Sequence, residues 1–337
     1  MFANLVPVPP VAPTTVLDIE LSHNSKKYFP GETLTGRVIL QTSEPIRARY
    51  LKISWEGSTR CEFGGMKKQV HLSNYVMPWI AETGDGIIPS GTHKFRFSFR
   101  LPSDAPPSFC GYYGSTTYSI YVELDRVWKW NMETEKTFKV VPKMCTAAMA
   151  PDMMVPTKFM KCKNSGTIFK DGVFSIKLNF QKRSFMPGES VEVIVTMENN
   201  SSKPIKSMQF ELIRQSHFHS QPQKVFCSLN TCLKDCPVPP NYTRNCEKVL
   251  NSRVYQCNVP PGETKQVMVA IDLPRGIPPT FESAMISMGY LLGFSLKNGS
   301  WTNNKIDCNA RIVIGNEKRI GVSGGKNAPL APPPYCP

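Results

Sequence analysis

The last residues of the chain contain a motif whose residue types suit recognition by another protein. Pro332, Pro333 and Tyr335 form the pattern Pro-Pro-x-Tyr near the end of the 337-residue sequence. Successive prolines hold the backbone in a polyproline II conformation without internal hydrogen bonds, so ordering it on binding costs little entropy. In a WW-domain complex, two such prolines lie in an aromatic groove and the tyrosine ring fills the adjoining pocket. We therefore predict that Pro332, Pro333 and Tyr335 form a WW-domain ligand.

A second group of chemically capable side chains lies in one segment of the second half. The segment contains His217, His219, Cys227, Cys232, Cys236, Cys246 and Cys257. Thiolates and imidazoles are zinc ligands, and Cys227, Cys232 and Cys236 are the candidates for a structural zinc site. No Cys-x-x-Cys pair is present, although small zinc sites usually hold their ligands in close pairs. The interpretation that we favour has no metal, with the cysteines as small apolar side chains or loop thiols.

The sequence lacks the local motifs that accompany common catalytic mechanisms. There is no Gly-x-Ser-x-Gly, no His-Glu-x-x-His, no Walker loop and no Gly-x-Gly-x-x-Gly that opens a helix. The five histidines are not near a serine or cysteine in the arrangement that a nucleophile needs. We therefore expect no catalytic residues and no cofactor, and we interpret the chain as a binding scaffold rather than an enzyme.

The chain is basic, with a formal net charge of +14. Residues 14–142 hold 16 basic and 13 acidic residues, whereas residues 173–337 hold 19 basic and 11 acidic residues. A basic surface suits a phosphorylated receptor tail or an anionic lipid leaflet. Ordinary solubilising charge is the alternative, since no run exceeds two adjacent basic residues. Nucleic acid is a weaker option, because no nucleic-acid motif accompanies the charge.

An internal repeat in the sequence indicates the secondary structure that carries these groups. Tyr28–Leu40 (YFPGETLTGRVIL) returns 157 residues later as Phe185–Met197 (FMPGESVEVIVTM). In both copies a Pro-Gly-Glu turn leads into apolar residues at every second position, which indicates a turn that feeds a half-buried strand. Such a pattern is common alone. Its significance comes from further matches in the same order.

Those matches extend the repeat over most of the chain. Ile88–Pro102 pairs with Val259–Pro274, and the sequence Pro-Pro-Ser-Phe at Pro106–Phe109 returns as Pro-Pro-Thr-Phe at Pro278–Phe281. Alternating apolar residues follow each match. With 30 prolines and 22 glycines to supply turns, these patterns predict a duplicated all-β unit of roughly 150 residues.

The amino-terminal residues bear on the compartment. Residues 1–13 contain several prolines and lack a basic stretch followed by a compact apolar one, so we expect no signal peptide and a cytosolic protein. The odd number of cysteines, 11, then argues against a disulfide framework. No apolar run of 18 residues is present, so we expect no membrane-spanning segment.

Several motifs resemble those of one known family, the α-arrestins or arrestin domain-containing proteins. The resemblance covers roughly residues 16–315. It depends on the aromatic-x-Pro-Gly-Glu turn, on the second-domain opening FQKRSFMPGESVEV (Phe180–Val193), and on the match of Gly111, Tyr112, Gly114, Tyr118 and Leu124–Arg126 to a family segment. The sequence departs from many members in carrying one Pro-Pro-x-Tyr motif rather than two.

The resemblance implies an all-β fold of two tandem immunoglobulin-like sandwiches joined by a short hinge. We expect a flexible start at 1–13, an arrestin-like N-domain at 14–142, a hinge at 143–170, a C-domain at 171–316 and a disordered tail at 317–337. Tails of this family recruit WW-containing HECT ubiquitin ligases. The implied function is an adaptor that binds the cytoplasmic tails of membrane receptors or transporters and promotes their ubiquitination, endocytosis or endosomal sorting.

Other functions remain open at this point. An arrestin-fold coat subunit like that of retromer would act without a ligase and would not need Tyr335. A thiol-regulated protein would use the cysteine-rich segment to bind zinc or a redox partner. For the adaptor we expect a cytoplasmic protein that works peripherally at the plasma membrane and endosomes, and no sequence motif identifies the cargo-binding residues.

Overall fold

The computed structural model describes residues 15–22, 27–65, 67–142, 151–166, 171–223, 236–300 and 304–316. Within these ranges the chain consists of β-strands and connecting loops, with two one-turn 3-10 helices, η1 (Pro151–Met153) and η2 (Pro240–Tyr242). No helix among the described residues is long and apolar enough to cross a bilayer. The predicted all-β fold is confirmed.

The first domain is a sandwich of two sheets that enclose one apolar core. The smaller sheet has the strand order β1 (Thr15–Leu21), β3 (Thr33–Thr42), β7 (Gly91–Arg100). The larger sheet has the order β2 (Lys27–Tyr28), β10 (Met132–Val140), β9 (Gly114–Arg126), β4 (Ile46–Cys61), β5 (Lys67–Ile80), with β6 (Gly86–Ile88) paired to β4 and β8 (Phe109–Cys110) paired to β9. Strand β5 is an edge of this sheet.

The second domain repeats this architecture around its own core. One sheet has the order β11 (Thr157–Asn164), β12 (Gly172–Phe180), β14 (Ser190–Ser201), β17 (Thr264–Asp272). The other has the order β13 (Ser184–Phe185), β19 (Lys305–Ile314), β18 (Ile286–Asn298), β15 (Ile205–His219), β16 (Thr243–Val259). Strand β16 occupies the edge position that β5 occupies in the first domain.

The region expected to be a hinge contains a strand. Residues Thr157–Asn164 form β11, which pairs antiparallel with β12 from Thr157 opposite Phe180 to Asn164 opposite Val173. Phe159 packs edge-on against Phe180, with ring centroids 5.8 Å apart. This pairing places β11 in the second sandwich, so the connection between the two sandwiches is shorter than the expected range 143–170. The sequence did not indicate strand β11, because β11 is an edge strand and its exposed lysines resemble the residues of a linker.

The repeated Pro-Gly-Glu turn has the same structure in both domains. Gly31 and Gly188 have φ angles of +79° and +83°, a conformation that glycine adopts without a steric penalty. The carboxylates of Glu32 and Glu189 accept hydrogen bonds from the backbone N–H of the residue three positions earlier, at 2.8 Å and 3.2 Å. The glutamates therefore satisfy backbone donors at the turn, which explains their place in both repeats.

A buried tyrosine is also duplicated. Tyr118 Oη donates to the Pro106 carbonyl at 2.7 Å, and Tyr290 Oη donates to the Pro278 carbonyl at 2.6 Å. Burial raises the pKa of both phenols, which keeps them protonated as donors. The Pro-Pro-x-Phe segments of the repeat are thus tied to the central strands β9 and β18. The internal duplication predicted from the sequence is confirmed at the level of single hydrogen bonds.

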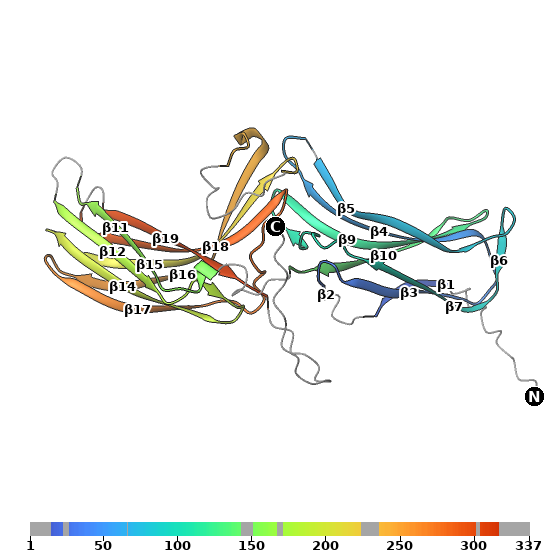
Figure 1. The fold of residues 1–337 in the computed structure, drawn as a ribbon, viewed down its shortest axis with the longest axis horizontal. Helices are drawn as coiled ribbons and strands as arrows, with labels where there is room; N and C mark the ends of the chain where they lie inside the picture. Colours follow the sequence, from blue (N-terminus) through green and yellow to red (C-terminus); the bar gives the residue numbers. More distant parts are fainter. Residues whose placement is uncertain are drawn as a thin grey trace, which may run out of the picture.

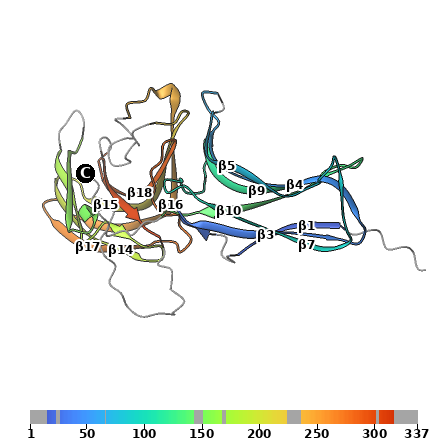
Figure 2. The same ribbon diagram turned by 45° about the vertical axis from the view of Figure 1, so that its right-hand side comes forward.

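The two sandwiches lie end to end along the long axis of the molecule (Figures 1 and 2). Aromatic rings from both domains pack together where the domains join. The ring centroid of Phe109 lies 5.4 Å from that of Phe281 and 6.2 Å from that of Phe218. The ring centroid of Tyr113 lies 5.8 Å from that of Phe218. Phe109 is buried in the core cluster of the second domain. The first domain therefore contributes side chains to the core of the second, and the two bodies share an apolar contact.

Candidate functional site

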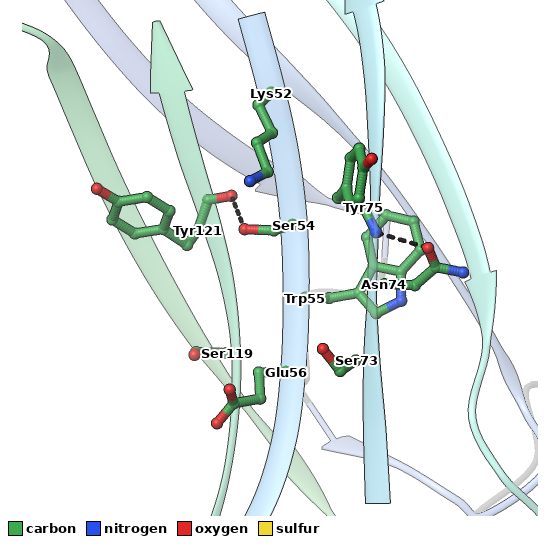
Figure 3. Close-up of a pocket in the computed structure, with 9 residues that line it drawn as sticks. All are labelled: Lys52, Ser54, Trp55, Glu56, Ser73, Asn74, Tyr75, Ser119 and Tyr121. Atoms are coloured by element: carbon green, nitrogen blue, oxygen red, sulfur yellow. Dashed lines mark hydrogen bonds between the residues drawn. The ribbon is translucent and has the colours of Figure 1, made fainter. Parts of the chain in front are cut away.

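The outer face of the larger N-domain sheet carries an open hollow between β4, β5 and β9. Successive residues of β4 point to opposite faces of the sheet. Ile53 and Trp55 therefore face the core, where Trp55 stacks on Phe99 with centroids 4.5 Å apart. Lys52 and Ser54 face outward with Glu56 (Figure 3). The hollow has a volume of about 580 Å³ and is lined by Lys52, Ser54, Trp55, Glu56, Ser73, Asn74, Tyr75, Ser119 and Tyr121.

Contacts inside the hollow hold its side chains in place. Lys52 Nζ lies 4.9 Å from the centroid of the Tyr75 ring, so a cation and an aromatic face from neighbouring strands lie together. Ser54 Oγ donates to the Tyr121 carbonyl at 3.2 Å (Figure 3). The Asn74 side chain accepts from the Tyr75 backbone N–H at 2.8 Å. The hollow offers hydroxyls, an amide, one cation, one carboxylate and aromatic rings, a set that suits a peptide side chain better than an apolar cofactor.

The rim of the hollow is charged in both signs. Lys68 Nζ lies 2.6 Å from Glu56 Oε1, and the hydrogen bond from Lys68 lowers the pKa of Glu56. On the opposite side, a hydrogen bond to the Glu133 carboxylate raises the pKa of Tyr121 to about 12. Tyr121 is therefore a neutral donor at physiological pH. These groups present a mixed polar surface around the hollow.

Strand β5 beside the hollow is an exposed edge with apolar side chains. Val70, Tyr75 and Ile80 are 50%, 54% and 59% exposed. Strand β5 pairs with β4 on one side, and no described strand extends the sheet on its other side. An edge strand of this kind offers backbone N–H and C=O groups to an added strand, while its side chains contact alternate residues of that strand. The arrangement can therefore bind an extended peptide.

The residues predicted from the sequence as ligase-binding, Pro332, Pro333 and Tyr335, lie outside the described residues. The zinc candidates Cys227 and Cys232 also lie outside them. Cys236 is described, and its Sγ lies 3.4 Å from the Nε2 atom of His219. The spacing of the cysteines alone gave no indication of this contact, because the partner of Cys236 is a histidine on β15.

Comparison with known proteins identifies the family. Residues 17–147 match the family model described as arrestin (or S-antigen), N-terminal domain, and residues 170–319 match arrestin (or S-antigen), C-terminal domain. The chain belongs to the arrestin family. The boundary between the two matched ranges agrees with the division of the structure into two sandwiches, and the second range contains every strand from β12 to β19 of this arrestin.

Individual relatives place this arrestin among the α-arrestins, as the sequence motifs predicted. It is 26% identical to arrestin domain-containing protein 4 of Mus musculus over an aligned region of 195 residues. This region makes up 52% of the chain and 46% of the relative. The chain is 24% identical over 212 residues to arrestin domain-containing protein 17 of Caenorhabditis elegans (55% and 48%), and 26% identical over 201 residues to human thioredoxin-interacting protein (55% and 50%). The chain spans about half the length of the curated relatives that it matches.

Membership of this family supports an adaptor-like role, because arrestin-family proteins are in general non-enzymatic adaptors that bind partner proteins. The hollow and the β5 edge were missed by the sequence reasoning. The alternation of apolar and polar residues along β4 predicts which of its side chains face outward. It does not predict that the neighbouring strands come from residues 67–80 and 114–126. Only the strand pairing brings Tyr75 and Tyr121 to the same face as Lys52.

Proposed function

We propose that this arrestin is an adaptor that binds membrane-protein cargo through its body and recruits a WW-domain HECT ubiquitin ligase through Pro332, Pro333 and Tyr335. The observation that carries the proposal is the order of the parts: a two-domain arrestin body to residue 316, followed by a segment that contains Pro-Pro-x-Tyr. The adaptor supplies effective concentration, since it holds ligase and cargo together, and the ligase performs the chemistry. It works in the cytoplasm, at the plasma membrane and endosomes.

Strand β5 and the adjoining hollow are the surface that we assign to cargo. A cytoplasmic tail in extended conformation adds to the β5 edge by backbone hydrogen bonds, and an aromatic or acidic side chain of that tail enters the hollow beside Lys52 and Tyr75. The exposed apolar residues Val70 and Ile80 support this assignment, because they need an apolar partner to leave water.

Binding of the tail to WW domains tests the ligase part of the proposal. A peptide of residues 326–337 and the same peptide with Tyr335→Ala are titrated against WW domains of HECT ligases. We expect binding of the first peptide and at least a tenfold weaker binding of the second, because the tyrosine pocket is left empty. The same substitution in the full chain should abolish ligase co-precipitation while its thermal unfolding stays unchanged.

The opposite result has a definite meaning. A wild-type peptide that binds no WW domain would remove the ligase from the mechanism. The arrestin body would then act as a coat or sorting subunit, for which Tyr335 is dispensable. A phosphorylated Tyr335 peptide is a second probe: the added charge should abolish binding in an apolar pocket.

Capture of membrane proteins tests the cargo part. The full chain and the double variant Val70→Asp, Tyr75→Ala are each immobilised and incubated with detergent-solubilised membrane proteins. The proteins that each one retains are then compared. We expect retained proteins to be lost from the double variant. Met268→Asp is the matched control, since Met268 is 68% exposed on β17, an edge strand of the other domain. Equal loss in the control variant would exclude a specific role for β5.

A further inference from the structure

Three potential metal ligands converge at the end of β15. His217 and His219 are two positions apart on this strand, so their side chains lie on the same face, and both are buried with exposed fractions of 1% and 2%. Their Nε2 atoms are 2.8 Å apart. Cys236 approaches from the segment before η2, and its Sγ lies 3.4 Å from His219 Nε2. The three ligand atoms all lie within 4.8 Å of one another.

The other nitrogen of each ring faces an oxygen. His217 Nδ1 lies 2.5 Å from Asn245 Oδ1 on β16, and His219 Nδ1 lies 3.5 Å from the carbonyl of Ala284. Both oxygens accept hydrogen bonds, so they favour the tautomer with the proton on Nδ1. This is the arrangement that metal-binding histidines have, because the outer hydrogen bond orients the ring and leaves the Nε2 lone pair for the ion.

The tautomer that these two outer hydrogen bonds favour competes with a hydrogen bond between the two Nε2 atoms, which needs a proton on one of them. If both rings carry their proton on Nδ1, two Nε2 lone pairs point at each other across 2.8 Å and repel. An imidazolium would relieve the repulsion, but both rings are buried, and burial disfavours the charged form. A divalent cation bound by the two nitrogens and the sulfur would remove this repulsion while both outer hydrogen bonds stay in place.

We propose that His217 Nε2, His219 Nε2 and Cys236 Sγ bind a zinc ion. Two imidazoles and a thiolate are a borderline-soft donor set that suits Zn²⁺. Zinc bonds of about 2.0–2.3 Å in a tetrahedron require N–N edges of about 3.3 Å and N–S edges of about 3.6 Å. The observed separations of 2.8 Å and 3.4 Å are slightly shorter than these edges, and the third pair of ligand atoms lies within 4.8 Å, so modest movements of the three side chains would form the tetrahedral edges. Binding displaces the thiol proton of Cys236, which leaves as H⁺ to solvent.

The position of the cluster gives the ion a structural consequence. Phe218, between the two histidines, points to the other face of β15 and contacts Phe109 and Tyr113 of the first domain. On the cysteine side, Tyr242 accepts a backbone hydrogen bond from Ser220 at 2.9 Å, and Arg244 lies 5.2 Å from the Phe63 ring. Zinc would therefore fasten the segment at 236–242 to β15, next to the contact between domains.

Metal content of the full chain tests the proposal. The protein is purified without chelators, and zinc is measured by mass spectrometry in the wild type, His219→Ala, Cys236→Ser and Cys162→Ser. We expect about one zinc per chain in the wild type and in Cys162→Ser, whose cysteine is exposed on β11. We expect at least a tenfold lower content in the other two. Asn245→Ala should weaken zinc affinity by about 10–100-fold, because it removes the outer hydrogen bond of His217.

A second measurement keeps the test valid if His219→Ala fails to fold. Cobalt is exchanged for zinc in the wild type, Cys236→Ser and Cys162→Ser, after circular dichroism has established that each is folded. A thiolate-to-cobalt charge-transfer band should appear in the wild type and Cys162→Ser and be absent from Cys236→Ser. Folded wild type that binds neither metal in competition with a chelator would overturn the proposal, as would equal zinc content in all variants. Neither result bears on the proposed ligase recruitment, which is tested separately by WW-domain binding.

Discussion

At the residue scale, the hydrogen bonds of single side chains explain why particular residues recur between the domains. Tyr118 and Tyr290 are both buried, and each hydroxyl satisfies a proline carbonyl that would otherwise be left without a donor in the interior. Glu32 and Glu189 do the same for backbone N–H groups at the turns. Their repetition at equivalent places indicates that these contacts belong to the fold itself rather than to one binding site.

Replacement of either buried tyrosine by phenylalanine should destabilise its domain. Tyr118→Phe and Tyr290→Phe each leave a proline carbonyl without its donor, so we expect the free energy of unfolding to fall by about 1–2 kcal/mol. Urea denaturation of the full chain measures this. Tyr112→Phe is the control: Tyr112 is 80% exposed, and its substitution should change stability little. Equal effects at positions 112 and 118 would contradict the assigned role.

His71 should make stability depend on pH. Burial lowers the pKa of His71 below 6.5, and the charge of Asp104 partly opposes this; its Nε2 lies 2.7 Å from Thr59 Oγ1. Below pH 6.5 the imidazole is protonated in the unfolded chain but stays neutral in the folded chain. The contribution of His71 to the free energy of unfolding is therefore fully present above that pH and is lost as the solution is acidified. His71→Gln should show a shallower fall between about pH 7.5 and pH 5.5 in urea denaturation. Parallel pH profiles for the two proteins would contradict this.

At the element scale, short strand β8 joins the two halves of the molecule. It pairs with β9 of the first domain, while Phe109 at its start packs on Phe218 and Phe281 of the second. Gly111 follows immediately, and a Cβ atom there would lie 2.8 Å from the Phe218 ring. The segment that carried the family resemblance in the sequence thus contributes to the contact between the two domains.

Truncation of Phe109 should weaken both domains. We expect Phe109→Ala to lower the free energy of unfolding by about 3–5 kcal/mol, because it opens a cavity in a core shared between the sandwiches. In differential scanning calorimetry both transitions should move to lower temperature. Phe138→Ala is the matched control, since Phe138 lies in the core of the first domain alone. A Phe109→Ala variant whose second transition stays at the wild-type temperature would show that the contact does not couple the domains.

At the scale of the whole molecule, two features of the surface bear on function. The chain carries a net charge of +14, and the hairpins β4–β5 and β15–β16 rise on the same side of the molecule where the domains meet (Figures 1 and 2). Each hairpin ends its sheet with an exposed edge strand. The molecule therefore presents two exposed edge strands on one side of a chain that is basic overall.

The basic charge should give a weak, salt-sensitive affinity for anionic membranes. We expect the full chain to sediment with vesicles that contain phosphatidylserine and to be released as ionic strength rises, because exposed charges are screened over about 8 Å at physiological salt. Vesicles of phosphatidylcholine alone are the control. Equal binding to both kinds of vesicle, or binding that salt leaves unchanged, would show that the net charge serves solubility.

The amino-acid sequence was sufficient to predict most of the strands, the internal duplication and the family. Alternating apolar residues fix which face of a strand is buried, and the repeated Pro-Gly-Glu and Pro-Pro-x-Phe segments lie at turns whose geometry depends on neighbouring residues alone. The Pro-Pro-x-Tyr prediction is of the same local kind and remains to be tested. Strand β11 was the exception, since its polar edge position resembled a linker.

Contacts between residues that are distant in the sequence could be identified only from the folded structure. His217 and His219 share a face because of their spacing, but their contact with Cys236 depends on the return of the chain from β15 toward β16. The hollow beside Lys52 likewise needs Tyr75 and Tyr121 from two neighbouring strands. Spacing along one strand sets the direction of a side chain. The partner across a loop is set by the packing of the whole domain, because many registers satisfy the same local pattern.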